Sequence, residues 1–339
     1  ARIIIMDEPT APLTMRESED LYRITEGLRD DGVSIIFISH RLEDMYRLAS
    51  RVTVFRDSRY VGTWNLGEIS RDGLIMAMVG REITQFFPKR KVHIGEEILK
   101  VEGLSRTGYF KDVSFAVRRG EILAMTGLIG AGRTEVCESI YGVTHPDSGK
   151  IYLEGREIHV SDPAQAIGMG IGYLPEDRLR QGLVLDWELW KNVTLPTLRN
   201  FTTLGWLHTR REAEITKTLA EKLEVKAGGV FDKAATLSGG NQQKVIVAKL
   251  LAGEMKVIIL DEPTKGVDVG AKTAIFNIMN DLADAGYGIV MVSSEMAEVL
   301  GMSDRIVVMR EGRVAAILDT AGATQESILG AAMAEAVAK

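Results

Sequence analysis

The sequence of 339 residues contains one cysteine and no uninterrupted apolar run of 18 residues. A single cysteine, Cys137, excludes a disulfide within the chain and fits a reducing compartment. Its place in a helical pattern predicts a small buried side chain. Without an apolar run of about 20 residues, no segment is predicted to span a membrane, and no signal peptide is recognisable.

Positive charge is not in excess either. The chain has 41 Lys and Arg against 47 Asp and Glu, a net charge of −6, which gives no support for nucleic acid as an electrostatic partner. The apolar content of 45% and charged content of 26% are typical of a globular protein, and the length predicts about two domains. Because the chain opens with an apolar strand and not with Met, we interpret it as the C-terminal part of a longer protein.

One segment occurs twice. Residues 3–10 read Ile-Ile-Ile-Met-Asp-Glu-Pro-Thr, and residues 257–264 read Val-Ile-Ile-Leu-Asp-Glu-Pro-Thr. The copies lie 254 residues apart, and the same spacing separates two further pairs, Gly32 from Gly286 and Ser39 from Ser293. The sequence therefore contains an internal repeat, which sets the domain partition.

The two copies differ at one decisive position, where His40 of the first is matched by Ser294 of the second. An apolar strand that ends in Asp-Glu is typical of a Mg²⁺-nucleotide site, and a later strand that ends in His is typical of its phosphate sensor. The first copy is therefore predicted to be equipped for ATP chemistry and the second to be impaired.

Hydrophobic periodicity divides the chain into three parts. Residues 1–82 are interpreted as the C-terminal part of a first domain, 83–97 as a linker and 98–339 as a complete second domain. Apolar runs that alternate with helices predict an α/β fold with a parallel sheet. The basic run Lys89-Arg90-Lys91 in the linker is predicted to be solvated.

Several elements can be placed from the same periodicity. In the first domain we expect strands at 3–6 and 33–39, a helix at 16–29 and a hairpin of 52–56 with 60–63 around Asp57-Ser58. In the second we expect strands at 98–102, 113–117, 121–126 and 171–174, a hairpin over 150–158, an inserted mainly helical part at 178–223, a helix at 244–252, and a terminal helix at 326–338.

A glycine-rich segment in the second domain has the context of a phosphate-binding loop. Residues 127–134 read Gly-Leu-Ile-Gly-Ala-Gly-Arg-Thr, follow a predicted strand and open a predicted helix. Glycines let backbone N–H groups surround phosphates, and the helix N-terminus adds positive potential. Arg stands where such loops usually have Lys, and its planar group is bulkier than an ammonium. The candidate nucleotide contacts are Gly127, Gly130, Ala131, Gly132, Arg133, Thr134 and Glu135.

The most specific motif is Leu-Ser-Gly-Gly-Asn-Gln-Gln at residues 237–243. A serine and two glycines at a helix N-terminus form a second anion site, and the motif lies shortly before the second Asp-Glu-Pro-Thr. Its candidate nucleotide contacts are Ser238, Gly239, Gly240, Asn241 and Gln242.

These motifs resemble the ATP-binding cassette (ABC) family, in which 237–243 would be the signature and Asp-Glu the Walker B motif. Four segments more narrowly resemble the tandem-cassette ATPases of bacterial monosaccharide importers (ribose, galactose, xylose, arabinose): 130–135, 175–178, 237–244 and 265–272. The resemblance implies a P-loop NTPase cassette with a parallel core sheet, an antiparallel β subdomain and an inserted helical subdomain. It also implies ATP and Mg²⁺ as cofactors.

The family pattern implies roles for particular residues. Asp7, Thr134 and Asp261 would serve Mg²⁺, Glu8 would be the general base, and His40 would contact the γ-phosphate. Each ATP would lie between one cassette's Walker B and the other's signature, so that Asp7, Glu8 and His40 would work with 237–242. Glu262 would belong to the second site, and Glu176 stands where a cassette usually has its metal-sensing Gln. Tyr109 or Phe110 is the candidate adenine partner, with core packing as the alternative.

Two departures bear on this assignment. The phosphate loop and signature of the first cassette would lie upstream of Ala1, and Pro12 occupies a position where the family commonly has a small residue. The resemblance implies an ATPase that energises import of a monosaccharide at the cytoplasmic face of the bacterial inner membrane. Its partners would be a membrane-integral sugar permease and, indirectly, a periplasmic sugar-binding protein, with no nucleic acid.

Two other functions stay open. One is a truncated regulatory remnant that binds nucleotide without hydrolysing it. The other is an ABC protein acting on ribosomes or DNA, which the acidic balance and the lack of a basic arm or long coiled coil disfavour. The transported sugar cannot be read from the sequence.

Overall fold

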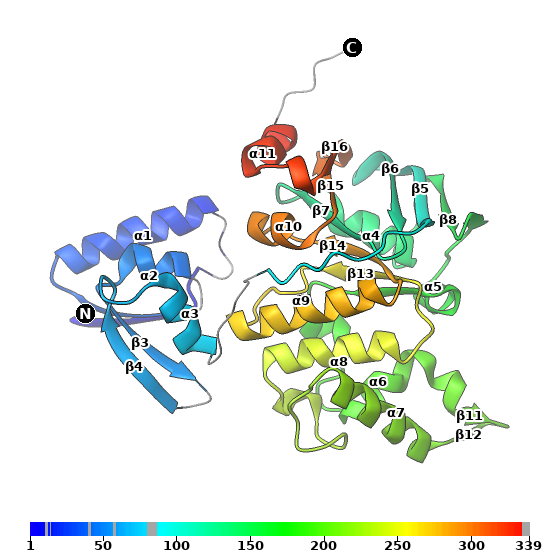
Figure 1. Cartoon of the computed structure of the whole chain (residues 1–339), viewed down its shortest axis with the longest axis horizontal. Helices are drawn as coiled ribbons and strands as arrows, with labels where there is room; N and C mark the ends of the chain where they lie inside the picture. Colours follow the sequence, from blue (N-terminus) through cyan, green and yellow to red (C-terminus); the bar gives the residue numbers. More distant parts are fainter. Residues whose placement is uncertain (11–12, 14, 40–41, 57–58, 80–86, 334–339) are drawn as a thin grey trace, which may run out of the picture. The chain divides into compact units, whose positions relative to one another are not determined.

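The computed structural model describes residues 1–339 except 11–12, 14, 40–41, 57–58, 80–86 and 334–339. The chain forms two compact units (Figure 1). The first comprises Ala1–Phe86 with Gly266–Lys272, and the second comprises Phe87–Lys265 with Thr273–Lys339.

The first unit contains two strand pairs and three helices. Strands β1 (Ile3–Asp7) and β2 (Ser34–Ile38) are parallel, and β3 (Arg51–Arg56) and β4 (Arg59–Asn65) form an antiparallel hairpin. The helices are α1 (Met15–Asp30), α2 (Leu42–Leu48) and α3 (Arg71–Val79). The predicted strands, helix and hairpin are confirmed, while Asp57, Ser58, Pro12 and His40 lie outside the described residues.

The second unit is built on a six-stranded sheet in the order β10-β13-β14-β7-β15-β16, parallel except for β16 at one edge. Its strands are β7 (Ile122–Gly127), β10 (Ile171–Leu174), β13 (Val257–Asp261), β14 (Gly288–Val292), β15 (Arg305–Arg310) and β16 (Arg313–Asp319). Strands β13 and β14 are continuous apolar runs that are wholly buried, as expected for the centre of a parallel sheet.

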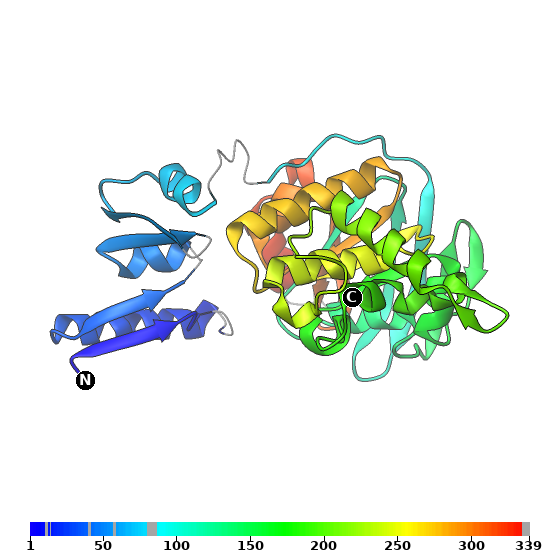
Figure 2. The same ribbon diagram turned by 90° about the horizontal axis from the view of Figure 1, so that it is seen from below.

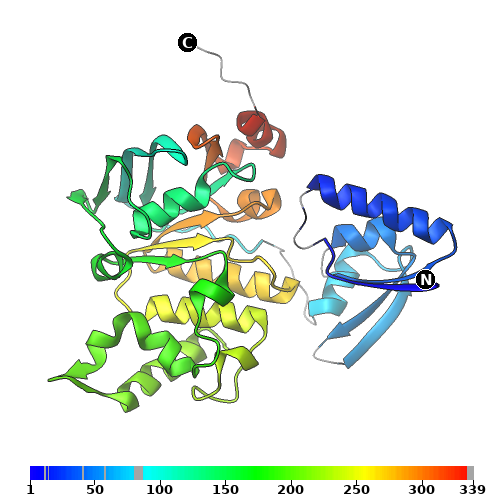
Figure 3. The same ribbon diagram turned by 180° about the vertical axis from the view of Figure 1, so that it is seen from behind.

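An antiparallel sheet and a helical part complete this unit. The sheet has the order β6-β5-β8-β9, from β5 (Glu97–Arg106), β6 (Phe110–Arg118), β8 (Ser148–Leu153) and β9 (Arg156–Ile158). The helical part carries α6 (Leu189–Thr194), α7 (Thr209–Lys222), α8 (Gly239–Leu251), a π-helical turn at Arg178–Gly182, a 3₁₀ stretch at Leu195–Phe201 and the short hairpin of β11 (Thr202–Thr203) with β12 (Trp206–Leu207). Figure 3 shows these helices gathered at one end of the unit, away from the antiparallel strands. The predicted α/β fold with antiparallel and helical parts is confirmed.

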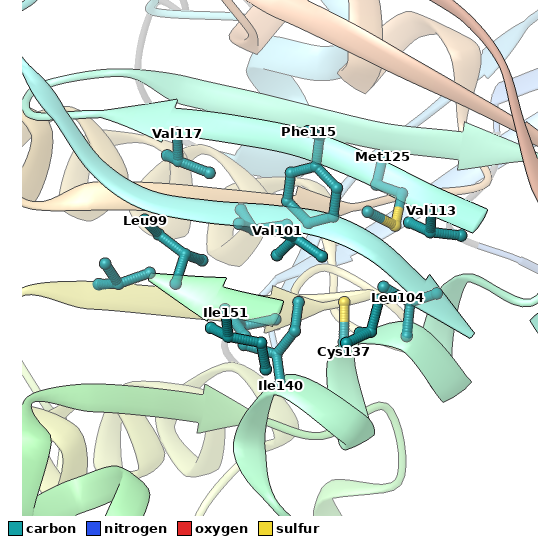
Figure 4. Close-up of a cluster of buried hydrophobic side chains, with 14 of the residues drawn as sticks. Leu99, Val101, Leu104, Val113, Phe115, Val117, Met125, Cys137, Ile140 and Ile151 are labelled. Carbon is teal, nitrogen blue, oxygen red and sulfur yellow. The ribbon is translucent and has the colours of Figure 1, made fainter. Parts of the chain in front are cut away.

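The remaining helices are α4 (Arg133–Tyr141), α5 (Pro163–Met169), α9 (Val269–Asp284), α10 (Met296–Met302) and α11 (Gln325–Met333). Helix α4 packs into the core between the two sheets, where Val136, Cys137 and Ile140 meet Leu99 and Val101 of β5. Figure 4 shows Cys137 and Ile140 directed into this cluster. Cys137 is fully buried, as predicted.

The segment that begins at Phe87 packs against the second unit. The Lys89 ammonium lies 2.7 Å from the Asp304 carboxylate and its side chain is 20% exposed. Arg90 pairs with Asp281, and the Asn280 side chain donates to the Pro88 carbonyl at 2.7 Å. The prediction of a solvated basic run is therefore wrong for Lys89, because acidic groups far along the chain neutralise it.

The two copies of the repeat fold alike. Their ladders share one register at a spacing of 254 residues: Ile3 with Ser34 and Val257 with Gly288 in the parallel pairs, Arg51 with Asn65 and Arg305 with Asp319 in the hairpins. They differ in what lies between, because β7 separates β14 from β15, whereas the described part of the first unit has β1–β2 and β3–β4 as separate sheets. Figure 2 shows these two strand pairs as distinct ribbons.

Candidate functional site

The loop between β7 and α4 has the backbone of an anion-binding loop. Gly127, Gly130 and Gly132 have φ of 152°, 78° and 90°, which L side chains rarely adopt. A Cβ atom at Gly127 would lie 2.2 Å from the Met309 carbonyl oxygen, so β15 leaves no room for a side chain. The loop delivers its N–H groups to the N-terminus of α4, where positive potential favours an anion.

Arg133, the first residue of α4, reaches the ends of two neighbouring strands. Its Nη1 donates to the Ser293 carbonyl at 3.2 Å and lies 3.7 Å from Glu262 Oε1. The two side chains are only 12% and 10% exposed. The guanidinium is therefore partly committed to groups of the protein itself, in the place where a lysine would be free to meet phosphates.

Asp261 ends β13 beside this loop. It is fully buried, and Tyr173 donates to its Oδ2 at 3.0 Å. Its Oδ1 has no partner in hydrogen-bond geometry within the described part of the chain. Burial raises the pKa of Asp261, while the side chains of Thr134 and Tyr173 lower it.

These groups could hold a hard divalent cation. The described residues contain no cluster of three or more His, Cys, Asp and Glu side chains suited to a metal. An ion here would take Asp261, the Thr134 hydroxyl and oxygens of a bound phosphate or water, which is the incomplete protein shell that Mg²⁺ prefers.

Glu262 follows Asp261 with a left-handed φ of 47°, and its N–H donates to the Val292 carbonyl at 2.9 Å. Burial raises the pKa of Glu262 to about 7, against the lowering effects of Arg133 and the Ser294 side chain. The carboxylate can thus exchange a proton near neutral pH, but Ser294 offers no second titrating group beside it.

The first copy repeats this local geometry at Asp7 and Glu8. Asp7 ends β1, and Glu8 has a φ of 46° with its N–H donating to the Ile38 carbonyl at 2.9 Å. Both acidic pairs therefore sit on the same strained turn after a parallel strand. His40, predicted to work beside Glu8, lies outside the described residues.

A buried carboxylate that the sequence reasoning missed joins the two loops of each copy. Glu298, 1% exposed, accepts from the Thr264 hydroxyl at 2.7 Å and from the Ser293 hydroxyl at 3.0 Å. Asp44, at the same spacing of 254 residues and fully buried, accepts from Thr10 at 2.6 Å and Ser39 at 2.7 Å. The repeat spacing was the signal that could have found them, since all three positions recur in both copies.

The motif at 237–243 forms the start of α8. Ser238 is the residue before the helix and accepts at Oγ from the Asn241 side chain at 2.9 Å, while Asn241 Oδ1 accepts from the Lys226 N–H at 2.8 Å. Gln242, 7% exposed, donates to the Ala234 carbonyl at 3.2 Å. These bonds fix the loop that leads into the glycines Gly239 and Gly240.

Other predicted residues occupy varied places. Glu176 accepts from Lys265 at 2.6 Å, and Glu135 lies in the first turn of α4. Phe110 is a core residue, 4% exposed. Tyr109 is half exposed beneath the Arg106 guanidinium, which lies 4.0 Å from the ring centroid, and its carbonyl closely backs Gly132. Tyr109 is thus the aromatic that stands beside the phosphate loop.

Among the described residues no helix has both the length and the apolar character needed to cross a bilayer. In the described structure no hydrogen bond or ion pair joins the start of α8 to the loop at 127–134.

Comparison with known proteins places this geometry. The model of the family described as ABC transporter matches residues 110–265. The ribose import ATP-binding protein RbsA of Geobacillus kaustophilus (strain HTA426) is 46% identical over 332 residues, which is 98% of this chain and 67% of that protein. The chain belongs to the ABC transporter family of ATP-binding proteins.

Further ABC relatives agree. The ribose import ATP-binding protein RbsA of Bacillus subtilis (strain 168) is 45% identical over 97% of this chain and 67% of its own length. The chain thus spans about two thirds of the curated relatives it matches. Two solved structures, a nucleotide-free ATP-binding cassette from an ABC transporter and an ATP binding subunit of an ABC transporter, each superpose with a TM-score of 0.57. They cover 70% and 68% of this chain and 95% and 98% of their own chains, at 24% and 26% identity. The second unit is therefore an ABC cassette, with 127–134 as its phosphate loop and Asp261-Glu262 at its Walker B position.

Proposed function

We propose that the chain is the C-terminal part of the ATP-binding subunit of a monosaccharide importer, and that its second cassette binds nucleotide but turns it over slowly. The observation that carries this proposal is the engagement of Arg133 by Glu262 and by the Ser293 carbonyl. The group that should neutralise the developing phosphate charge is held by the protein, and the carboxylate that should activate water is held by that cation.

In this site the loop N–H groups and Thr134 bind the phosphates and orient them, and the Tyr109 ring lies where it can stack on adenine. Thr134 and Asp261 would hold Mg²⁺, which neutralises phosphate charge when bound. Glu262 polarises a water only when it is free of Arg133. Ser294 supplies no imidazole to the γ-phosphate, so binding outlasts hydrolysis.

The first copy is the proposed hydrolytic one, because it has the Asp7–Glu8 turn together with His40. In this proposal Glu8 is the general base and the signature residues Ser238, Gly239 and Gly240 serve the nucleotide on which it acts. The relatives are named for ribose import, which supports a pentose or related sugar, a membrane permease as partner and a position at the inner face of the cell membrane. The slow second site also accommodates the regulatory alternative for this chain taken alone.

One experiment on the purified chain tests the binding site. We expect a fluorescent ATP analogue with Mg²⁺ to bind, and Arg133→Ala to weaken binding about tenfold or more, since a charged hydrogen bond to phosphate is lost. Arg180→Ala, at an arginine whose side chain is 87% exposed, is the matched control and should bind as the parent does.

The same samples test the slow turnover. Phosphate release by the chain should stay well below about 1 s⁻¹, the low end of ordinary enzymatic rates. A faster rate would show that Arg133 and Ser294 permit hydrolysis and would refute the asymmetry, whereas equal binding by both arginine variants would refute the site.

A further inference from the structure

We propose that the first unit is a strand acceptor: the cleft between β2 and β3 binds a separate polypeptide segment made of an apolar strand, a glycine-rich loop and a helix. The inference rests on the internal repeat and does not depend on nucleotide turnover by the second cassette.

The cleft lies within the first unit and has a volume of about 600 Å³. Residues 33–39 line one side and 48–55 the other. Across β2, the Ser34 N–H donates to Arg2 and the Ile38 carbonyl accepts from Glu8, so these residues bond toward β1. Successive residues of a parallel strand bond to opposite neighbours, so Ile35 and Phe37 turn their backbone groups toward the cleft.

The second unit identifies the kind of segment that fits there. Its β7 lies between β14 and β15, pairing in register with Ile289–Val292 on one side and Arg305–Met309 on the other. The residues 254 positions earlier are 35–38 and 51–55, and every one of them lines the cleft. The backbone bonds agree, since the Ile289 N–H donates to a β7-side carbonyl, that of Glu121. The cleft thus has the lining of a slot for one parallel strand.

The apolar face beside the slot indicates which element should come after the inserted strand. Four isoleucines of β1 and β2 are between 45% and 66% exposed: Ile3, Ile5, Ile36 and Ile38. Their counterparts at 257, 259, 290 and 292 are at most 1% exposed, in the cluster that includes Val136, Cys137 and Ile140 of α4. A helix with an apolar face, joined to the inserted strand by a short loop, would cover these isoleucines.

A synthetic peptide of residues 119–142 of this sequence contains β7, the loop and α4 and serves as the probe. We expect a labelled peptide, with photo-leucine in place of Leu123, to bind the 339-residue chain saturably and to cross-link to residues 33–39 and 48–55. Hydrogen exchange at the Ile35 and Phe37 amides should slow when the peptide is present.

The matched control changes the peptide and leaves the protein intact. An Ala124→Pro peptide lacks an N–H of the strand's backbone and should bind about tenfold or more weakly. Equal binding by this peptide, no binding by either peptide, or cross-links at the sheet edges β10 or β16 would overturn the proposal. So would a stable dimer of the chain that the peptide fails to dissociate, because a second copy would then fill the cleft. Arg133→Ala in the protein should leave peptide binding unchanged, which separates this proposal from the nucleotide site.

Discussion

Replacing Glu262 by Gln should make the second cassette more stable at alkaline than at acidic pH, relative to the parent. Glu262 is about 10% exposed, and burial is the main cause that raises its pKa from 4.5 to about 7. A carboxyl whose pKa is raised on folding favours the folded state fully below pH 4.5, and this contribution is lost as pH rises through about 7.

The magnitude can be worked from the shift. A difference of one pKa unit corresponds to about 1.4 kcal/mol, so the ionised Glu262 costs the folded state roughly 3 kcal/mol above pH 7. Between pH 5 and pH 8 the parent should lose roughly 2–3 kcal/mol that Glu262→Gln does not lose. For a unit of this size the melting temperature of the variant should gain roughly 5–10 °C over the parent across that interval.

The assay is thermal and urea denaturation of parent and variant at pH 5 and pH 8. Any constant cost of placing an amide beside Arg133 cancels between the two pH values. Glu154→Gln is the control of opposite sign, because hydrogen bonding to Lys256 lowers the pKa of Glu154. Its ionised form favours the folded state, so that variant should lose stability toward alkaline pH, only slightly since the site is exposed. A Glu262→Gln effect that does not change with pH, or that decreases at pH 8, would refute the reasoning.

Two further substitutions test the scaffold by urea denaturation. Gly127→Ala should destabilise the second unit by about 3 kcal/mol or more, because its Cβ would lie 2.2 Å from a β15 carbonyl oxygen; Gly130→Ala, with open space around it, should lose only about 1–2 kcal/mol for its left-handed backbone, and equal losses would contradict the steric argument. Thr264→Val keeps the side-chain shape but removes a hydroxyl that donates to buried Glu298, so we expect a loss of about 1–3 kcal/mol. The exposed Thr218→Val should change stability by less than about 0.5 kcal/mol, and a Thr264→Val loss no larger than this would show that Glu298 is satisfied without Thr264.

The sequence predicted the elements whose pattern is local. Strand 171–174 was placed to the residue, since an apolar run between turn residues has few alternatives, and the phosphate loop could be placed from the spacing of its glycines. Contacts between distant residues were out of reach: nothing near Lys89 indicates its pairing with Asp304. The same holds for Glu298, which looks like an ordinary helical glutamate until the fold brings Thr264 and Ser293 to it.

The positions at which the two copies agree and differ bear on how the repeat is used. The elements that shape each acidic turn recur in both: the left-handed glutamates Glu8 and Glu262, and a buried carboxylate that joins the Walker B turn to the next strand. Asp44 and Glu298 differ by one methylene, yet each receives the same pair of hydroxyls. A copy that had lost all use would have no reason to keep such a costly buried carboxylate satisfied. The second copy has therefore retained the architecture that positions nucleotide while Arg133 and Ser294 replace the groups that act on it, which is the arrangement expected of a site that binds ATP and leaves hydrolysis to its partner.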